Sequence, residues 1–152
     1  KNGWQLLHNW RIPPGMQEDG YLNPKHFNKW LQRVKTISSE SGHLDVSFYH
    51  IGSVLIHSPA DPKGLWIDKV IAEALNDQDA KKMRDGYRDG IYNSRGAYFV
   101  DPSGKPEREF AEQFYQKAEA VENASFHRFA TMLKSLAENY KQEAEKIIYE
   151  HK

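Results

Sequence analysis

The chain of 152 residues contains no cysteine. No disulfide framework can therefore stabilise the fold, and no thiolate can act as a nucleophile or as a metal ligand. The lack of cysteine fits a reducing compartment, and we expect the protein to be cytoplasmic. The sequence also has no apolar run of about 20 residues, the length that a transmembrane helix requires. We therefore expect no membrane as a partner.

The chain has no excess of charge of either sign. It carries 21 Lys and Arg residues against 21 Asp and Glu residues, so its formal net charge is zero. Proteins that bind nucleic acids depend heavily on a basic surface. The weaker alternative is that the protein binds nucleic acid through a local basic patch at Lys81, Lys82, Arg84 and Arg88. We do not expect nucleic acid to be the partner.

Signatures of catalysis and of cofactor binding are absent as well. The sequence has no phosphate-binding G-x-x-x-x-G-K-[ST] loop, no G-x-G-x-x-G after a strand and no nucleophile elbow. Five possible metal ligands gather in one stretch, but histidine pairs on metal-binding helices lie three or four residues apart. These residues are His43, Asp45, His50, His57 and Asp61, and His50 and His57 are seven apart. We therefore predict no catalytic residue, no metal and no cofactor.

What the chain does contain is helical periodicity. Hydrophobic residues make up 39% of it and aromatic residues 12%, and they recur at steps of three and four, which is typical of amphipathic helices. Asn23 before Pro24 predicts one helix start, and Gly42 predicts the end of that helix. The other predicted helices contain Trp4–Trp10, begin at Asp45, contain Leu65–Leu75, begin at Asp77 or Asp79, begin at Pro106, and begin at a Ser125 cap.

These patterns predict an all-α fold. We expect a single-domain bundle of six or seven helices over residues 1–152, with a long C-terminal helix that packs antiparallel to the helix before it. A short irregular or hairpin-like insertion is predicted near residues 96–105, where Gly, Pro and aromatic residues interrupt the periodicity. Gly86 and Gly90 lie one helical turn apart, and two such glycines in a helix predict that another backbone approaches closely.

The insertion also carries the candidate binding residues, which are Asn93, Arg95, Glu107 and Arg108. The planar guanidinium group of an arginine after a helix end can hold backbone carbonyls or a carboxylate. We interpret the four residues first as a cluster that pins the insertion to the helices. The alternative is a ligand-binding or enzymatic pocket around Asn93, Arg95 and Glu107. The nearby pair Asp85 and Asp89 has basic neighbours, which favours ion pairs over acid–base catalysis.

Several short motifs carry a resemblance to a known group of proteins. They include Trp4-Gln-Leu-Leu-His-Asn-Trp10, the pair Gly86 and Gly90, Asn93-Ser-Arg95-Gly96, and Glu107-Arg108. On these motifs the chain resembles the C-terminal helical region of large uncharacterised bacterial proteins. Family members tend to have paired glycines before the Glu-Arg step, where this chain has Ser103-Gly104-Lys105-Pro106. The resemblance implies a module attached to a larger protein and assigns no catalytic residue.

The sequence therefore predicts a non-catalytic helical interaction or regulatory module. We expect the chain to be a fragment from the C-terminal part of a longer bacterial protein. Its expected partner is the rest of the parent chain or another protein.

Overall fold

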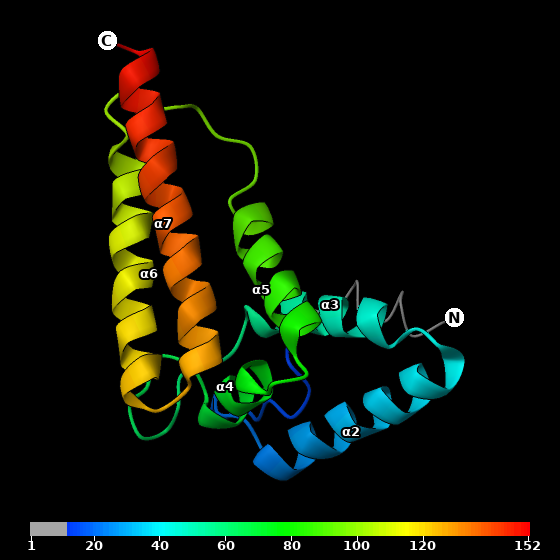
Figure 1. Cartoon of the computed structure of the whole chain (residues 1–152). Coiled ribbons are helices and arrows are strands. Elements are labelled where there is room, and N and C mark those ends of the chain that lie inside the picture. The colour runs from blue at the N-terminus through cyan, green and yellow to red at the C-terminus, as the bar shows by residue number, and fades with distance from the viewer. Residues whose placement is uncertain (1–11) are drawn as a thin grey trace. The chain divides into compact units, whose positions relative to one another are not determined.

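A computed structural model describes residues 12–152, which contain six α-helices and no β-strand (Figure 1). The predicted all-α class is therefore confirmed. The chain divides into two compact units, the first ending at Ser94 and the second spanning Arg95–Lys152. That all these helices form one bundle stays a prediction. The helix predicted at Trp4–Trp10 lies outside the described residues.

The first unit contains α2 (Pro24–Ser41), α3 (Leu44–Leu55), α4 (Lys69–Asn76) and α5 (Lys81–Ser94). The Asn23 side chain accepts a hydrogen bond from the backbone N–H of His26, and Pro24 fills the first turn of α2. Gly42 ends that helix in the left-handed conformation, with φ of 75°. Both predicted ends of α2 are therefore confirmed, because each residue meets the backbone requirement of its position.

Helices α3 and α5 pack with their backbones in contact. A Cβ atom added to Gly86 on α5 would stand 1.8 Å from the carbonyl oxygen of Tyr49, and one added to Gly52 on α3 would stand 1.9 Å from that of Met83. A Cβ atom added to Gly90 would be 3.2 Å from the Cα of Ser53. The predicted close approach at Gly86 and Gly90 is confirmed, and Gly52 contributes to the same contact.

Three predicted helix starts in the first unit are wrong. Asp45 lies in the first turn of α3, and His43 takes the capping position without a side-chain hydrogen bond. Helix α4 begins at Lys69 and not at Leu65, because the buried Asp68 caps it by accepting the N–H of Val70 at 2.9 Å. Helix α5 begins at Lys81, and the carbonyl of Ala80 accepts the first helical N–H, that of Arg84, so neither Asp77 nor Asp79 holds the capping position. Asp77 instead accepts the N–H of Asp79 in the preceding turn.

The second unit consists of α6 (Lys105–Asn123) and α7 (His127–Glu150). The contacting pairs between them are Phe110 with Tyr140, Tyr115 with Glu138, and Glu122 with Lys134. As the number rises along α6 it falls along α7, so the predicted antiparallel packing is confirmed. The two helices lie side by side in Figure 1.

The connection between α6 and α7 differs from its prediction. Ser125 has a φ of 72°, which is the left-handed conformation, and Phe126 precedes the first residue of α7. The backbone N–H of Ser125 donates to the carbonyl of Glu122, and that of Phe126 donates to the carbonyl of Val121. Ser125 thus terminates α6 in the manner of a C-terminal glycine, and its predicted capping of α7 is wrong.

The segment between Arg95 and Gly104 is irregular and contains no strand. Of the two predicted forms of the insertion, irregular and hairpin-like, the irregular one is therefore observed. A turn at Asp101-Pro-Ser-Gly104 closes the segment, since the N–H of Gly104 donates to the carbonyl of Asp101 at 3.0 Å. Gly104 then leads into the first turn of α6, where Pro106 lies as predicted.

Candidate functional site

Two of the four candidate residues meet in the second unit. The Arg95 guanidinium donates to the Oε2 atom of Glu107 at 2.8 Å, and the side chains are 15% and 0% exposed, respectively. Glu107 lies in the first turn of α6. Its negative charge is favourable there because the N-terminus of a helix carries a partial positive charge. The pair joins the irregular segment to α6, as the first interpretation of the sequence predicts.

Aromatic rings complete the environment of Arg95. Its guanidinium carbon lies 3.3 Å from the ring centroid of Tyr98 and 5.1 Å from that of Phe110. A planar cation stacks favourably on such rings. The hydroxyl of Tyr98 in turn donates to Glu143 on α7 at 3.1 Å. Partial burial, followed by this hydrogen bond to Glu143, raises the pKa of Tyr98. The Tyr98 side chain is thus fixed by Arg95 at the face of its ring and by Glu143 at its hydroxyl.

The second oxygen of Glu107 has a different environment. Its Oε1 atom is buried and has no hydrogen-bond partner among residues 12–152. Arg95 is therefore the ion-pair partner that offsets the cost of burying this carboxylate. The arginine is bound to the protein's own carboxylate, which leaves it poorly suited to capture an anion from solution.

The other two candidates do not share this arrangement. Asn93 is exposed near the end of α5 in the first unit, and Arg108 is exposed on α6. Neither side chain has a hydrogen bond to any residue of the described part of the chain. The expected cluster of four is therefore observed as one buried pair and two exposed side chains.

The segment that Arg95 holds presents an apolar tip. Phe99 is 102% exposed, and its neighbours Tyr98 and Val100 are 45% and 49% exposed. Beyond the tip, the Asp101 carboxylate accepts the N–H of Ser103 at 2.9 Å and its hydroxyl at 2.7 Å. These hydrogen bonds lower the pKa of Asp101. Sequence reasoning missed the tip because Ala97–Val100 has the composition of a half-buried strand.

Gly104 fixes the far end of this segment. It has a φ of 65°, and a Cβ atom at this position would lie 2.9 Å from the carbonyl oxygen of Ala144 on α7. The backbone therefore approaches α7 more closely than a residue with a side chain allows. We call residues 98–100 the aromatic tip, which is anchored at its start by Tyr98 and at its end by the Asp101–Gly104 turn.

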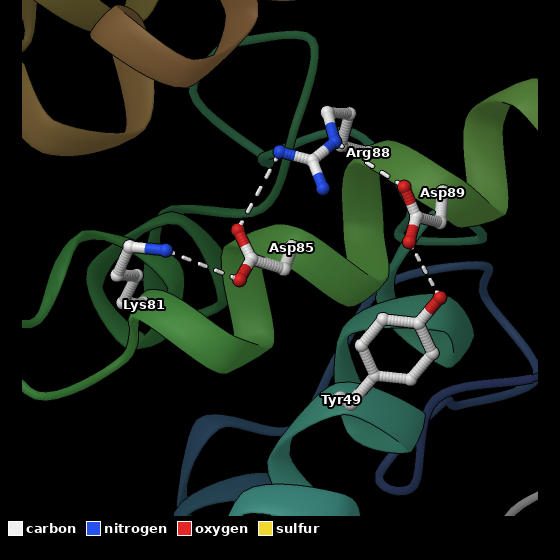
Figure 2. A network of polar contacts seen from close by, with 5 residues as sticks. All are labelled: Tyr49, Lys81, Asp85, Arg88 and Asp89. Carbon is white, nitrogen blue, oxygen red and sulfur yellow. Dashed lines mark hydrogen bonds and ion pairs between the residues drawn. The ribbon is translucent and has the colours of Figure 1, made fainter.

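A second polar cluster lies in the first unit, across α3 and α5 (Figure 2). The hydroxyl of Tyr49 donates to Asp89 at 2.6 Å, and the other oxygen of Asp89 accepts from the Nε of Arg88 at 3.2 Å. Arg88 also lies 3.5 Å from Asp85, which pairs with Lys81 at 3.3 Å. The ion pairs predicted for Asp85 and Asp89 are confirmed.

The polar contacts of this second cluster join α3 to α5. The hydrogen bond to Asp89 is the main cause that raises the pKa of Tyr49 above its ordinary value, which already keeps a tyrosine hydroxyl protonated at neutral pH. A tyrosine in this state is a hydrogen-bond donor and a poor nucleophile.

The same network includes part of the basic patch that was considered for nucleic-acid binding, because Lys81 and Arg88 are paired with carboxylates. Arg84 donates to the carbonyls of Leu75 and Asp77 at 2.8 and 2.7 Å.

The described residues contain neither a metal-binding cluster nor a membrane-spanning helix. Within residues 12–152, no three His, Asp or Glu side chains converge as the ligands of a metal ion would. In the same residues, no helix is both long enough and apolar enough to cross a membrane. Comparison of the chain with protein-family models, with curated proteins and with solved structures finds no match.

Proposed function

We propose that the protein is a non-catalytic helical module that binds another protein, or another part of a longer parent chain, through its aromatic tip. The observation that carries this proposal is the full exposure of Phe99 on a segment that is fixed at both ends. Burying a phenylalanine side chain contributes about 1.5 to 3 kcal/mol. Because Phe99 is exposed, this favourable free energy is not gained when the chain folds. It would be gained if a binding partner buried the Phe99 side chain.

The fixed ends matter because binding costs conformational entropy. A flexible loop must be ordered when it binds, and this ordering weakens the association. Tyr98 is already held by Arg95 and Glu143, and the following turn is closed by Asp101 and Gly104. The partner therefore meets an aromatic side chain whose backbone is already ordered. Aromatic residues of this kind are frequent among the residues that dominate binding energy at interfaces.

The arrangement of polar groups favours this function over an enzymatic or ligand-binding pocket. Arg95 and Glu107 bind each other, and the carboxylates of α5 are paired with basic side chains. The net charge of zero and the pairing of Lys81 and Arg88 favour a protein partner over a nucleic acid. We further propose that the module works in the cytoplasm, where a chain without cysteine loses no disulfide to the reducing conditions.

A photo-crosslinking experiment tests the proposal. The photoreactive residue p-benzoylphenylalanine would replace Phe99 in the protein made in its native cells. A matched variant would carry it at Tyr149, which is 75% exposed at the end of α7. We expect a discrete crosslinked product from position 99, either to one other protein or to another part of the parent chain. Mass spectrometry of the crosslinked peptides identifies the partner.

A folding control accompanies this experiment. Phe99→Ser should leave the melting temperature nearly unchanged, because an exposed side chain contributes within about 0.5 kcal/mol. The same substitution, introduced next to a crosslinker at Val100, should abolish the product. If positions 99 and 149 give the same pattern of products, the aromatic tip has no specific partner and the proposal is wrong.

A further inference from the structure

A groove in the first unit lies among α2, α3, α4 and the start of α5, and its volume is about 540 Å³. A pocket of this size is within the range of about 300 to 1,000 Å³ that is typical of ligand sites. The residues of α2 that line it are Gln32, Lys35, Thr36, Ser39 and Glu40. They recur at helical spacing along one side of α2. The groove therefore follows this helix for about 12 Å, which equals about four residues of extended chain.

The floor and the rim of the groove differ in character. Phe48, Ala80 and Met83 are buried beneath it, with half-buried Leu44 and Ala74 beside them. The rim carries three exposed carboxylates, those of Glu40, Asp77 and Asp79. None of the three forms an ion pair with a residue in the described part of the chain. This contrasts with the paired carboxylates Asp85 and Asp89 on the next turns of α5.

The groove lining contains one cationic side chain, that of Lys35, compared with these three acidic ones. The ammonium of Lys35 lies 5.8 Å from the ring centroid of Phe48. Arg84 is nearby in the chain but does not line the groove. Its guanidinium donates to the carbonyl oxygens of Leu75 and Asp77 and so caps the C-terminal end of α4. The side chains that line the groove therefore have two more negative charges than positive ones. A lining of this kind attracts a cationic ligand that also has an apolar part.

We infer that this groove binds a short segment of a partner protein that contains basic residues and at least one apolar side chain. The apolar side chain contacts Leu44 and Ala74, and the basic residues face the rim carboxylates. The inference rests on the proposed function, since it names the chemistry of one partner segment of the same interaction module. It concerns a separate surface, however, and its test does not involve the aromatic tip.

The test uses two fluorescently labelled synthetic peptides of twelve residues. One alternates lysine and leucine in pairs, and the other has glutamate in place of every lysine. Fluorescence anisotropy with the full chain at low salt measures both. We expect the basic peptide to bind and the acidic peptide not to bind. Removing two rim charges with Glu40→Gln and Asp79→Asn should weaken binding about fivefold, since exposed ion pairs are individually weak.

Two matched controls separate the groove from general attraction between charges. Glu18→Gln with Glu73→Gln removes the same number of exposed carboxylates outside the groove and should leave the affinity unchanged. Thr36→Trp places a large ring in the groove and should block binding, whereas Arg33→Trp, one turn earlier and outside the lining, should not. Both positions are exposed on α2, so the folded state should tolerate each ring.

Three outcomes overturn the inference. They are no binding of the basic peptide at about 1 mM, equal weakening by the rim and control charge variants, and equal binding of the acidic peptide. None of these outcomes affects the crosslinking result at Phe99. The proposed peptide binding in the groove can therefore be disproved while the proposed partner binding by the aromatic tip is retained. Failure of the crosslinking experiment would leave the peptide result interpretable as a binding site on its own.

Discussion

Gly86 on α5 lies directly against the backbone carbonyl of Tyr49 on α3. A Cβ atom at position 86 would stand 1.8 Å from the Tyr49 oxygen, a distance at which the backbones must move apart. Gly52 provides the reciprocal contact with the carbonyl of Met83, at 1.9 Å. The first unit is thus assembled around two helices whose separation is set by the absence of side chains.

Gly86→Ala should destabilise the first unit despite the better helix propensity of alanine. Alanine in an open helical position is favoured over glycine by about 1 kcal/mol, but overpacking against a backbone costs about 1 to 3 kcal/mol or more. We expect a net loss of about 2 kcal/mol, measured by urea denaturation. Gly90→Ala is the matched control with a smaller expected loss, because its nearest contacts are at 3.2 Å. Equal stability of the two variants would contradict the packing described for Gly86.

Arg95→Ala should destabilise the second unit by about 3 kcal/mol, because it leaves the buried Glu107 carboxylate without its ion-pair partner. Glu107 is fully buried, and its Oε1 atom already lacks a hydrogen bond within residues 12–152. Arg108→Ala removes a positive charge from the exposed face of the same region and should change stability by less than about 0.5 kcal/mol. The measurement is thermal unfolding followed by circular dichroism.

A double variant tests whether the unpaired charge is the cause. Adding Glu107→Gln to Arg95→Ala removes the buried charge and should restore part of the lost stability. If the double variant is as unstable as the sum of the two single ones, the contribution of Arg95 comes from its stacking on Tyr98 and Phe110 and not from the ion pair.

Tyr49→Phe should lower stability by about 1 kcal/mol at pH 7, since it removes a hydrogen bond to a carboxylate. The hydrogen bond to Asp89 raises the pKa of Tyr49 above its ordinary value of 10.0. Its contribution is therefore fully present below the pH at which the unfolded tyrosine ionises, and it is lost as the pH rises through the folded pKa. The two proteins should differ at pH 7, and the difference should begin to shrink above about pH 10 and disappear only above the raised folded pKa. Tyr149→Phe, at an exposed position, is the control and should show no difference at either pH.

Ser125→Gly should stabilise the connection between α6 and α7. Ser125 is the one residue other than glycine with a positive φ among residues 12–152, and the left-handed conformation costs a residue with a side chain about 1 kcal/mol. We expect a gain of that size in the free energy of unfolding. Ser135→Gly, at an exposed position inside α7, should instead lose about 0.5 to 1 kcal/mol. A loss in both variants would contradict the assigned role of Ser125.

Local sequence was sufficient where one residue alone meets a backbone requirement. Asn23 and Gly42 mark the ends of α2 because a side-chain acceptor and a left-handed backbone conformation are needed there. Prediction failed where the cap depended on neighbouring context. Asp68, and not Leu65, sets the start of α4, and Ser125 adopts a conformation that its side chain disfavours.

The candidate site shows the same division. Arg95 and Glu107 were recognisable because a cation after a helix and an acid in the next first turn have complementary requirements. Their grouping with Asn93 and Arg108 was not reliable, since nearness in sequence does not decide which side chains are buried. The groove along α2 could not be predicted, because its lining comes from four helices that are separated in the chain.

By itself the sequence determined the helical class, the antiparallel pairing of the last two helices and the close approach at Gly86, since each depends on periodicity or on the lack of a side chain. Only the tertiary structure decided that Phe99 is exposed and that Glu107 is buried. The sequence alone would suggest a buried phenylalanine and an exposed glutamate. The observed environments depend on contacts between residues distant in the chain, in particular those of Tyr98 with Glu143 and of Gly104 with Ala144.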